Sequence, residues 1–393
     1  MMLKKLKGFF IGRLNRLDYP VILRPSRKIQ SKGRVLYSYL ANPLLLRDYS
    51  PQFLGHSNLW ESRTIAHIFQ SLGYQVEAID FSDQEFMPSG KYDIVFDIFA
   101  NLGRLAPLLG KDTIKFLHCT GSDPYYQNAA ELERVTEVNQ RRNGNYLPKR
   151  IIAEPERTHI SLEAADVCSL IGNEHTRKTY PEKYWQKMEL MTVSASEIGK
   201  LAKKIREQVP AKKEFLWFFG SGAVHKGLDL LLEFFADHPE LQFHIVGNIA
   251  AENDFFELYK KELTETGNIH FHGYLLPTSS EFQLLLKDVF CFIAPSCSEA
   301  ISASVVTCMQ LGLYPIISRD TGVTLPEDSG LYIESLTTNE IEKLILMVIG
   351  MSDDELVYQI RKVQTYAILR FSRNAFRDQM KKFIVSALTQ FRI

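Results

Sequence analysis

The stretch that most constrains the fold runs from Phe292 to Ser318 and reads FIAPSCSEAISASVVTCMQLGLYPIIS. Apolar residues at 292–295 and at 314–318 predict two short buried strands. Between them, mostly small and apolar residues at 300–311 predict a buried helix of about three turns, which Gly312 is placed to end. A strand, a polar turn, a buried helix and a second strand make up the βαβ unit of a parallel sheet.

The polar turn of this unit, 296–299, holds its most informative residue, Glu299. In open α/β sheets, ligands bind outside the carboxyl ends of the strands, beside the start of the following helix. Glu299 lies at that place in the sequence, with Ser296 and Ser298 beside it. We therefore expect the rest of the chain to build a cleft that faces this turn.

Two series of alternating strands and helices surround this unit, and 393 residues exceed one ordinary core. A charged segment at 200–213, which contains Pro210, reads as the linker between them. The prediction is an α/β protein with two Rossmann-like domains facing a cleft. The predicted segments are a basic N-terminal segment at 1–34, an N-terminal domain at 35–199, a C-terminal domain at 200–373 and a final helix at 374–393.

The formal net charge of zero hides an asymmetry, because residues 1–34 hold ten Lys or Arg against one acid, Asp18. As a helix, this segment would place Leu3, Leu6, Phe10, Leu14 and Leu17 on one face with bases around it. That pattern fits peripheral contact with an anionic membrane, and equally a solvated arm or a helix packed on the body. The base-rich segment is short and has few interleaved aromatics, so nucleic acid is not an expected partner.

The five cysteines show no CxxC spacing and mostly lie in apolar runs. This distribution predicts free buried thiols in a reducing compartment rather than a disulfide framework. No apolar run approaches the roughly 20 residues of a membrane span. We therefore expect a cytoplasmic protein, at the inner face of the membrane if the basic segment binds lipid.

Four motifs in the C-terminal half resemble those of the GT-B glycosyltransferases, in particular the retaining enzymes of glycosyltransferase family 4. They are FFGSGAVHKGLDLLLEFF at 218–235, HIVG at 244–247, NIHFHGYL at 268–275 and the stretch at 292–318. The N-terminal half matches more loosely, through FLHCTGS at 116–122. The resemblance implies that the C-terminal domain binds a sugar nucleotide and the N-terminal domain binds the acceptor. It also implies that the last helix crosses back, and that neither metal nor cofactor is needed.

The resemblance also assigns residues to the donor. The glycine turn Gly220-Ser221-Gly222 would approach the diphosphate beside a helix start, and Lys226 would add a full positive charge. Glu299 matches the first glutamate of the family's E-x7-E motif, which contacts the donor sugar. The other residues implied at the site are His118, near the reacting sugar; Gly55, in a loop near the donor phosphates; Ser298, beside the glutamate; and Ala300, Ile301 and Ser302, through their backbone amides.

Two positions depart from the family pattern. The second glutamate of the E-x7-E motif, which commonly holds the ribose, is replaced by Thr307. The arginine that often follows the first glycine is replaced by Ser221, which leaves Lys226 alone or with Arg319 or His225 as a second base. These changes leave open which nucleotide and which sugar the donor carries.

The predicted function is a hexosyl-type transferase acting with retention and without metal. It would move sugar from a nucleoside-diphosphate sugar to a glycan or lipid-linked glycan acceptor in cell-surface polysaccharide synthesis. Two alternatives remain at this point: a GT-B scaffold or binding subunit that has lost catalysis, and a GT-B sugar-nucleotide epimerase. The first is motivated by Thr307 and Ser221. The second would need several acids in the cleft, which the sequence does not place.

Overall fold

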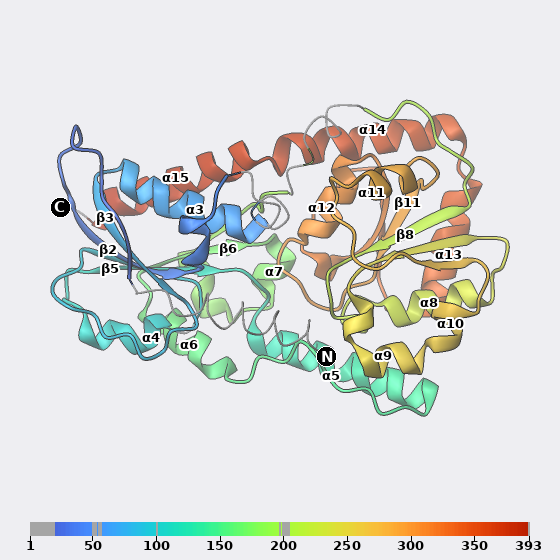
Figure 1. Ribbon diagram of the computed structural model, residues 1–393, viewed down its shortest axis with the longest axis horizontal. Helices are drawn as coiled ribbons and strands as arrows, with labels where there is room; N and C mark the ends of the chain where they lie inside the picture. Colours follow the sequence, from blue (N-terminus) through green and yellow to red (C-terminus); the bar gives the residue numbers. More distant parts are fainter. Residues whose placement is uncertain are drawn as a thin grey trace.

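The computed structural model describes residues 20–48, 53, 57–99, 101–195, 198 and 205–391. They form two α/β domains lying side by side (Figure 1). The N-terminal domain contains a seven-stranded sheet of order β1-β3-β2-β4-β5-β6-β7, parallel except for the edge strand β1. Its strands are β1 Val21–Leu23, β2 Gly33–Tyr39, β3 Tyr74–Asp80, β4 Ile94–Asp97, β5 Ile114–Cys119, β6 Val167–Ile171 and β7 Met188–Met191.

The C-terminal domain contains a six-stranded parallel sheet of order β10-β9-β8-β11-β12-β13. Its strands are β8 Glu214–Phe218, β9 Gln242–Val246, β10 Ile269–Phe271, β11 Cys291–Ala294, β12 Tyr314–Ser318 and β13 Leu331–Ile333. Every residue of β11 and β12 is buried, as expected for parallel strands with helices on both faces. The predicted fold class, α/β with two Rossmann-like domains, is confirmed.

The helices alternate with the strands of both sheets, as the sequence predicts. Residues 253–264 form two short helices that meet at Tyr259, a fully buried residue whose hydroxyl donates to Glu233. Helix α13 was not predicted. The helices are α3 Ser57–Ser71, α4 Asn101–Leu105, α5 Pro124–Arg142, α6 Pro155–Ala164, α7 Glu174–Lys178, α8 Leu228–Ala236, α9 Asn253–Leu258, α10 Lys260–Thr264, α11 Ser280–Leu285, α12 Ala303–Gln310, α13 Thr338–Gly350, α14 Asp353–Arg370 and α15 Arg373–Phe391; short 3-10 turns lie at Asn42–Leu45, Ala106–Leu108, Glu182–Lys187, Ile249–Ala251 and Arg319–Thr321.

The stretch from Phe292 to Ser318 forms most of β11, all of α12 and all of β12, and β11 pairs in parallel with β12. Helix α12 begins at Ala303 rather than at the predicted 300. The reason is that Ser302 remains extended and its N–H donates to the carbonyl of Thr321, outside the helix. The carbonyl of Ala300 lies so close to Gly322 that any side chain there would overlap it. The residues after Glu299 are therefore held as a loop before the helix starts.

Two long helices join the domains along one side of the molecule (Figure 1). Helix α14 packs against α12 in the C-terminal domain, and α15 continues from it across to α3 of the N-terminal domain. There, the ring of Phe383 lies 5.8 Å from that of Phe116, and Phe376 lies 6.0 Å from Trp60. The last helix thus returns to the N-terminal domain and is part of its core.

Helix α5 bridges the domains on the opposite side (Figure 1). It begins in the N-terminal domain, where Asp123 caps its first turn, and ends at Asn143, which takes the left-handed conformation at φ 46°. Along its length, Arg134 and Arg141 both pair with the buried carboxylate of Asp229 on α8, each at 2.6 Å. The polar face of this helix is therefore an interdomain contact.

Three further predictions concern the basic N-terminal segment, the five cysteines and the lack of a membrane span. Residues 1–19 of the predicted basic segment lie outside the described residues, whereas Val21–Leu23 form β1 and so belong to the sheet. All five cysteines are free and buried, which confirms that no disulfide framework exists. Within the described part of the chain, no helix combines the length and the apolar character that crossing a membrane requires.

Candidate active site

A cavity of about 480 Å³ lies between the two domains. Its walls come from residues at or just after the carboxyl ends of parallel strands in both sheets: Tyr39 and Leu40 after β2, Ile98 and Phe99 after β4, Thr120 after β5, and Phe218, Phe219 and Gly220 after β8. The loop and first turn before and within α12 complete it, through Ala300, Ile301, Ala303, Ser304 and Thr307. We call it the first cavity. It occupies the place where open α/β sheets bind ligands.

The glycine turn lies at the edge of the first cavity. Gly220 lines it and is exposed, with open space beside its Cα, and Ser221 is also exposed. Gly222 is buried at φ +86°, a conformation that favours glycine. Its N–H donates to Glu252 at 2.5 Å, and the N–H of Ala223 donates to the same carboxylate at 3.2 Å.

This arrangement corrects the prediction that the glycine turn approaches the donor diphosphate beside a helix start. The amides of Gly222, in the glycine turn, and of Ala223, the next residue, are already bound to an internal carboxylate, Glu252, and so do not face a ligand. Helix α8 does not follow the glycine turn directly, because it starts only at Leu228. What remains for a phosphate at this edge is the open backbone at Gly220 and the exposed hydroxyl of Ser221.

Lys226 and Glu299, the two charged residues predicted at the site, form an ion pair with each other. Their side chains are 6% and 16% exposed, and neither lines the first cavity. Burial lowers the pKa of Lys226, against the opposing effect of the Glu299 carboxylate. The structure thus brings the predicted cation and the predicted acid together, as partners of one another rather than as separate faces of the cleft.

Only some residues of the loop before α12 line the first cavity. Ala300 and Ile301 line it, but Ser302 uses its N–H on Thr321, which corrects its predicted role as a ligand amide. Ser298 is buried, and its carbonyl accepts from His225. Thr307 lines the cavity, yet its hydroxyl donates to the carbonyl of Ala303 at 2.7 Å, so it is already engaged within the helix.

His118 lies behind the cavity wall. Its ring is fully buried, Nδ1 lies 2.8 Å from the hydroxyl of Ser169, and Nε2 has no partner among the described residues. Burial lowers the pKa of His118 to about 3, so the ring is neutral at physiological pH. Strand residues alternate in direction, and His118 shares the core face of β5 with Phe116. The ring therefore does not line the first cavity, and its predicted contact with the donor sugar stays a prediction.

The remaining predicted residues do not add a cation to the first cavity. Gly55 lies outside the described residues. Arg319 is half exposed and pairs with Glu334 at 2.7 Å, away from the first cavity. His225 is buried and held by other residues on both ring nitrogens.

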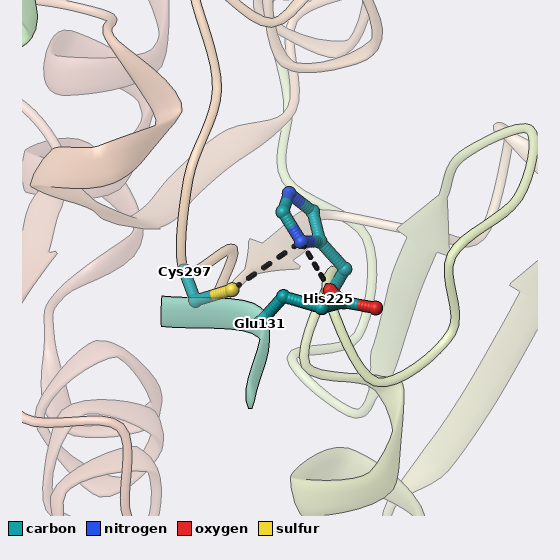
Figure 2. A group of neighbouring side chains, drawn as sticks. All are labelled: Glu131, His225 and Cys297. Atoms are coloured by element: carbon teal, nitrogen blue, oxygen red, sulfur yellow. Dashed lines mark hydrogen bonds and ion pairs between the residues drawn. The ribbon is translucent and has the colours of Figure 1, made fainter. Parts of the chain in front are cut away.

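His225 belongs to a buried group with Glu131 of α5 and Cys297 of the turn after β11 (Figure 2). The possible ligand atoms of the three residues lie within 4.8 Å of one another, a spacing that a metal ion could bridge. In the structure, Nδ1 of His225 lies 2.6 Å from the Glu131 carboxylate, and Nε2 lies 2.6 Å from the carbonyl of Ser298. Both partners are acceptors, so this geometry fits a ring that donates from each nitrogen.

The group therefore serves as an interdomain contact. Burial raises the pKa of Glu131, but the hydrogen bond and the charge of His225, with two backbone amides, outweigh it and lower that pKa overall. Glu131 stays ionised and ties α5 to the C-terminal domain. The ligand atoms of this group are satisfied by one another and by the backbone.

Four site residues were missed by the sequence predictions. Thr120 follows the end of β5 and lines the first cavity, and Ser122 donates from its hydroxyl to the carbonyl of Glu299 at 2.7 Å. Arg150 lies against Gly222, where an added Cβ would come within 3.3 Å of its Cγ. Glu61 lines the first cavity from α3. The FLHCTGS motif could have pointed to the first two, whereas no local pattern marks the others.

Glu61 is an unusual acid, because it is 2% exposed and lines the cavity, and the positive charge of Arg373 offsets only part of the effect of its burial. Its carboxylate accepts from the N–H of Ser194 at 2.6 Å. Burial raises the pKa of Glu61 to about 7, a shift that this hydrogen bond only partly offsets. The first cavity therefore holds a carboxyl group that changes charge near neutral pH.

Part of this chain resembles a known protein family in sequence, and its fold resembles those of solved structures. Residues 200–326 match the sequence profile of the family described as glycosyl transferases group 1. No curated protein is similar enough in sequence to count as a relative. Sucrose-phosphate synthase from Thermosynechococcus elongatus is similar in structure at 12% identity and a TM-score of 0.59, over 91% of this chain and 99% of that chain.

Two further solved structures are similar. Anabaena HepE in complex with UDP and glucose matches at 12% identity and a TM-score of 0.53, over 91% of this chain and 99% of that one. TarM matches at 13% identity and a TM-score of 0.50, over 76% of this chain, which spans 55% of the length of TarM. At these identities the likeness concerns the fold, and it confirms the predicted GT-B arrangement of two Rossmann-like domains.

Proposed function

We propose, from a glycosyl transferases group 1 domain set in a GT-B fold, that this protein transfers a sugar from a nucleoside-diphosphate sugar to a glycan or lipid-linked glycan. The observation that carries the proposal is the first cavity. It joins the carboxyl ends of both sheets and is bordered by the glycine turn on one side and the start of α12 on the other. A donor bound there would span the exposed Gly220 and the loop at Ala300 and Ile301.

Lys226 would neutralise charge on the leaving diphosphate. In the free protein its partner is Glu299, so donor binding would exchange one anion for another beside the same ammonium. The released Glu299 carboxylate would then accept a hydrogen bond from the donor sugar. This exchange keeps Lys226 paired at each stage, which a buried cation requires.

The reaction would break the bond between the sugar C1 and the diphosphate oxygen and form a bond from C1 to the acceptor oxygen. With retention, the acceptor proton would pass to the leaving phosphate, which makes a separate general base unnecessary. His118 is buried behind the wall of the first cavity, near Thr120, and its Nε2 has no hydrogen-bond partner among the described residues. It would contact the substrate only if the substrate or the cavity wall moved. We expect the reaction to need no metal, and the setting to be cell-surface polysaccharide synthesis at the inner membrane face.

The test is a transfer assay with the purified full chain and nucleotide sugars, without added metal. UDP-glucose is the first donor to try, because the similar HepE structure was solved with UDP and glucose. We expect release of UDP that increases with acceptor. A folded protein that releases no nucleotide from any common nucleotide sugar would contradict the proposal.

A second candidate is a GT-B binding or scaffold subunit without catalysis. It is favoured by one observation: the anion-binding groups of the glycine turn and Lys226 are occupied by Glu252 and Glu299. Calorimetry against nucleoside diphosphates separates the two. An enzyme should bind UDP or another diphosphate at micromolar to low millimolar concentration, and a scaffold that has lost the site should bind none.

A further inference from the structure

A second cavity of about 370 Å³ adjoins the first. Ile98, Phe99 and Thr120 line both cavities, so the two share a wall at the ends of β4 and β5. All the residues lining the second cavity belong to the N-terminal domain, between positions 98 and 180. A molecule in the second cavity would therefore lie beside a donor in the first.

The charge of the second cavity is one-sided. Its lining residues include Lys149 and Arg150 and no aspartate or glutamate. Lys149 is compensated by Asp254, to which its ammonium is hydrogen-bonded. Arg150 is exposed, and within the described part of the chain its guanidinium makes no hydrogen bond or ion pair. One full positive charge at this cavity is thus without a partner.

The backbone of Arg150 is fixed although its side-chain end is free. Its N–H donates to Glu131 at 3.1 Å, and its carbonyl accepts from the side-chain amide of Gln127 at 2.6 Å. The stem of the side chain rests over Gly222, as the close approach of its Cγ shows. Such anchoring reduces the freedom that the guanidinium would lose on binding a ligand.

Thr158 supplies an independent sign of a ligand. It lines the second cavity, is 6% exposed, and its hydroxyl oxygen is buried without a hydrogen-bond partner among the described residues. Buried hydroxyl groups are nearly always hydrogen-bonded, since a buried hydroxyl without a hydrogen-bond partner destabilises the fold. An oxygen-rich molecule in the cavity would give this hydroxyl its partner.

We propose that the second cavity holds the acceptor, and that this acceptor carries an anionic group, a phosphate ester or a carboxylate, bound by Arg150 with Thr158 as a hydrogen-bond partner. The inference rests on the proposed function, because it names the substrate class of the same cleft. Guanidinium groups bind both anions through paired N–H donors, so the chemistry is shared between a sugar phosphate and a uronate.

The test measures binding of small anionic sugars to the full chain saturated with UDP, which fills the first cavity. The probes are glucose 6-phosphate, glucuronate and the neutral methyl glucoside, followed by calorimetry or ligand-observed NMR. We expect at least one anionic probe to bind and methyl glucoside to bind at least tenfold more weakly. Binding of the phosphate alone names a phosphorylated acceptor, and binding of glucuronate alone names a uronate.

Variants then assign the site. Arg150→Ala should weaken binding of the anionic probe at least tenfold, Arg150→Lys should retain part of it, and any loss of UDP affinity should stay below tenfold. The matched control is Arg157→Ala, since Arg157 is a nearby arginine that pairs with Glu154 outside the cavity. Equal binding of neutral and anionic probes, or no effect of Arg150→Ala, would overturn the proposal. A tenfold loss of UDP affinity in Arg150→Ala would assign Arg150 to the donor phosphates instead, and would also overturn it.

Thr158→Val gives a second readout. Its melting temperature should equal or exceed that of the wild type, because the hydroxyl has no partner to lose, while binding of the anionic probe should fall. Unchanged binding would remove Thr158 from the site. If the wild type fails to bind UDP, the proposed function fails, and the same probes titrated without UDP decide separately whether Arg150 binds anions.

Discussion

The ammonium of Lys226 and the carboxylate of Glu299 are joined in a buried ion pair that links the turn after β8 to the turn after β11. The two residues lie 73 positions apart, in separate motifs. Their contact means that the free protein neutralises the cation that we propose stabilises the leaving diphosphate. A donor diphosphate would have to compete with Glu299 for it.

Substitutions at this pair should separate stability from turnover. Lys226→Met and Glu299→Gln should each destabilise the protein, by about 3 kcal/mol or more where an uncompensated buried charge is left. Each should also lower turnover at least tenfold, or about 1.4 kcal/mol in the barrier. Denaturant unfolding and a steady-state transfer assay measure the two effects.

The double variant Lys226→Met/Glu299→Gln is the matched control for this prediction. It removes both charges, so it should recover most of the lost stability but none of the lost turnover. Turnover that recovered together with stability would show that the pair is structural only.

Glu61 should make stability depend on pH. Its pKa is raised to about 7 in the folded protein from a usual 4.5, so the folded state keeps a proton that the unfolded state has released between these values. Stability from this group is therefore highest below pH 4.5 and declines as pH rises towards 7, by roughly 3 kcal/mol at most.

Glu61→Gln should remove this dependence while keeping an oxygen for the N–H of Ser194. We expect the variant to be more stable than the wild type at pH 8 and similar to it at pH 4.5, in melting temperatures measured across that range. A difference that is constant with pH would contradict the assignment.

Thr307→Val should leave donor affinity nearly unchanged. The threonine hydroxyl donates to the carbonyl of Ala303, so it is not free to hold a ribose hydroxyl. We expect the dissociation constant for UDP to change by less than about threefold, or roughly 0.6 kcal/mol. A tenfold loss, measured by calorimetry, would show that Thr307 turns towards the nucleoside when the donor binds.

Asp229→Asn should weaken the contact between the domains. Asp229 is fully buried and is shared by Arg134 and Arg141, so removing its charge leaves the buried guanidinium of Arg134 and the partly exposed one of Arg141 with less compensation. We expect a loss of about 3 kcal/mol or more in unfolding free energy. The exposed Asp288→Asn, in the same domain, is the control and should change stability by less than about 0.5 kcal/mol.

A chelator should not abolish transfer. Lys226, rather than a metal ion, is expected to stabilise the leaving diphosphate, so activity after treatment with EDTA should stay within about twofold of the untreated enzyme. Elemental analysis of the same sample would show whether the Glu131, His225 and Cys297 group carries an ion. Activity that vanishes with EDTA and returns with one metal would contradict metal-independent transfer.

Much of the fold could be read from local patterns. Strands β11 and β12 are buried on both faces, and such strands show as continuous apolar runs of a few residues. The end of α5 at Asn143 is also a local feature, because asparagine adopts the left-handed backbone conformation that ends a helix. The position of Glu299 after a strand followed from the same logic. Helix α13 was missed although its pattern is amphipathic, and α12 was started too early because Thr321 and Gly322, far along the chain, hold its first residues extended.

The sequence by itself determined which strands are apolar along their length, which side chains are charged and where the chain turns, since these depend on side-chain chemistry and spacing. Only the tertiary structure decided which groups meet. It paired Lys226 with Glu299, placed Glu252 on the amides of the glycine turn and left Arg150 unpaired beside Gly222. Coulombic and hydrogen-bond energies depend on distance in space and on burial, and neither is a property of neighbouring positions in the chain.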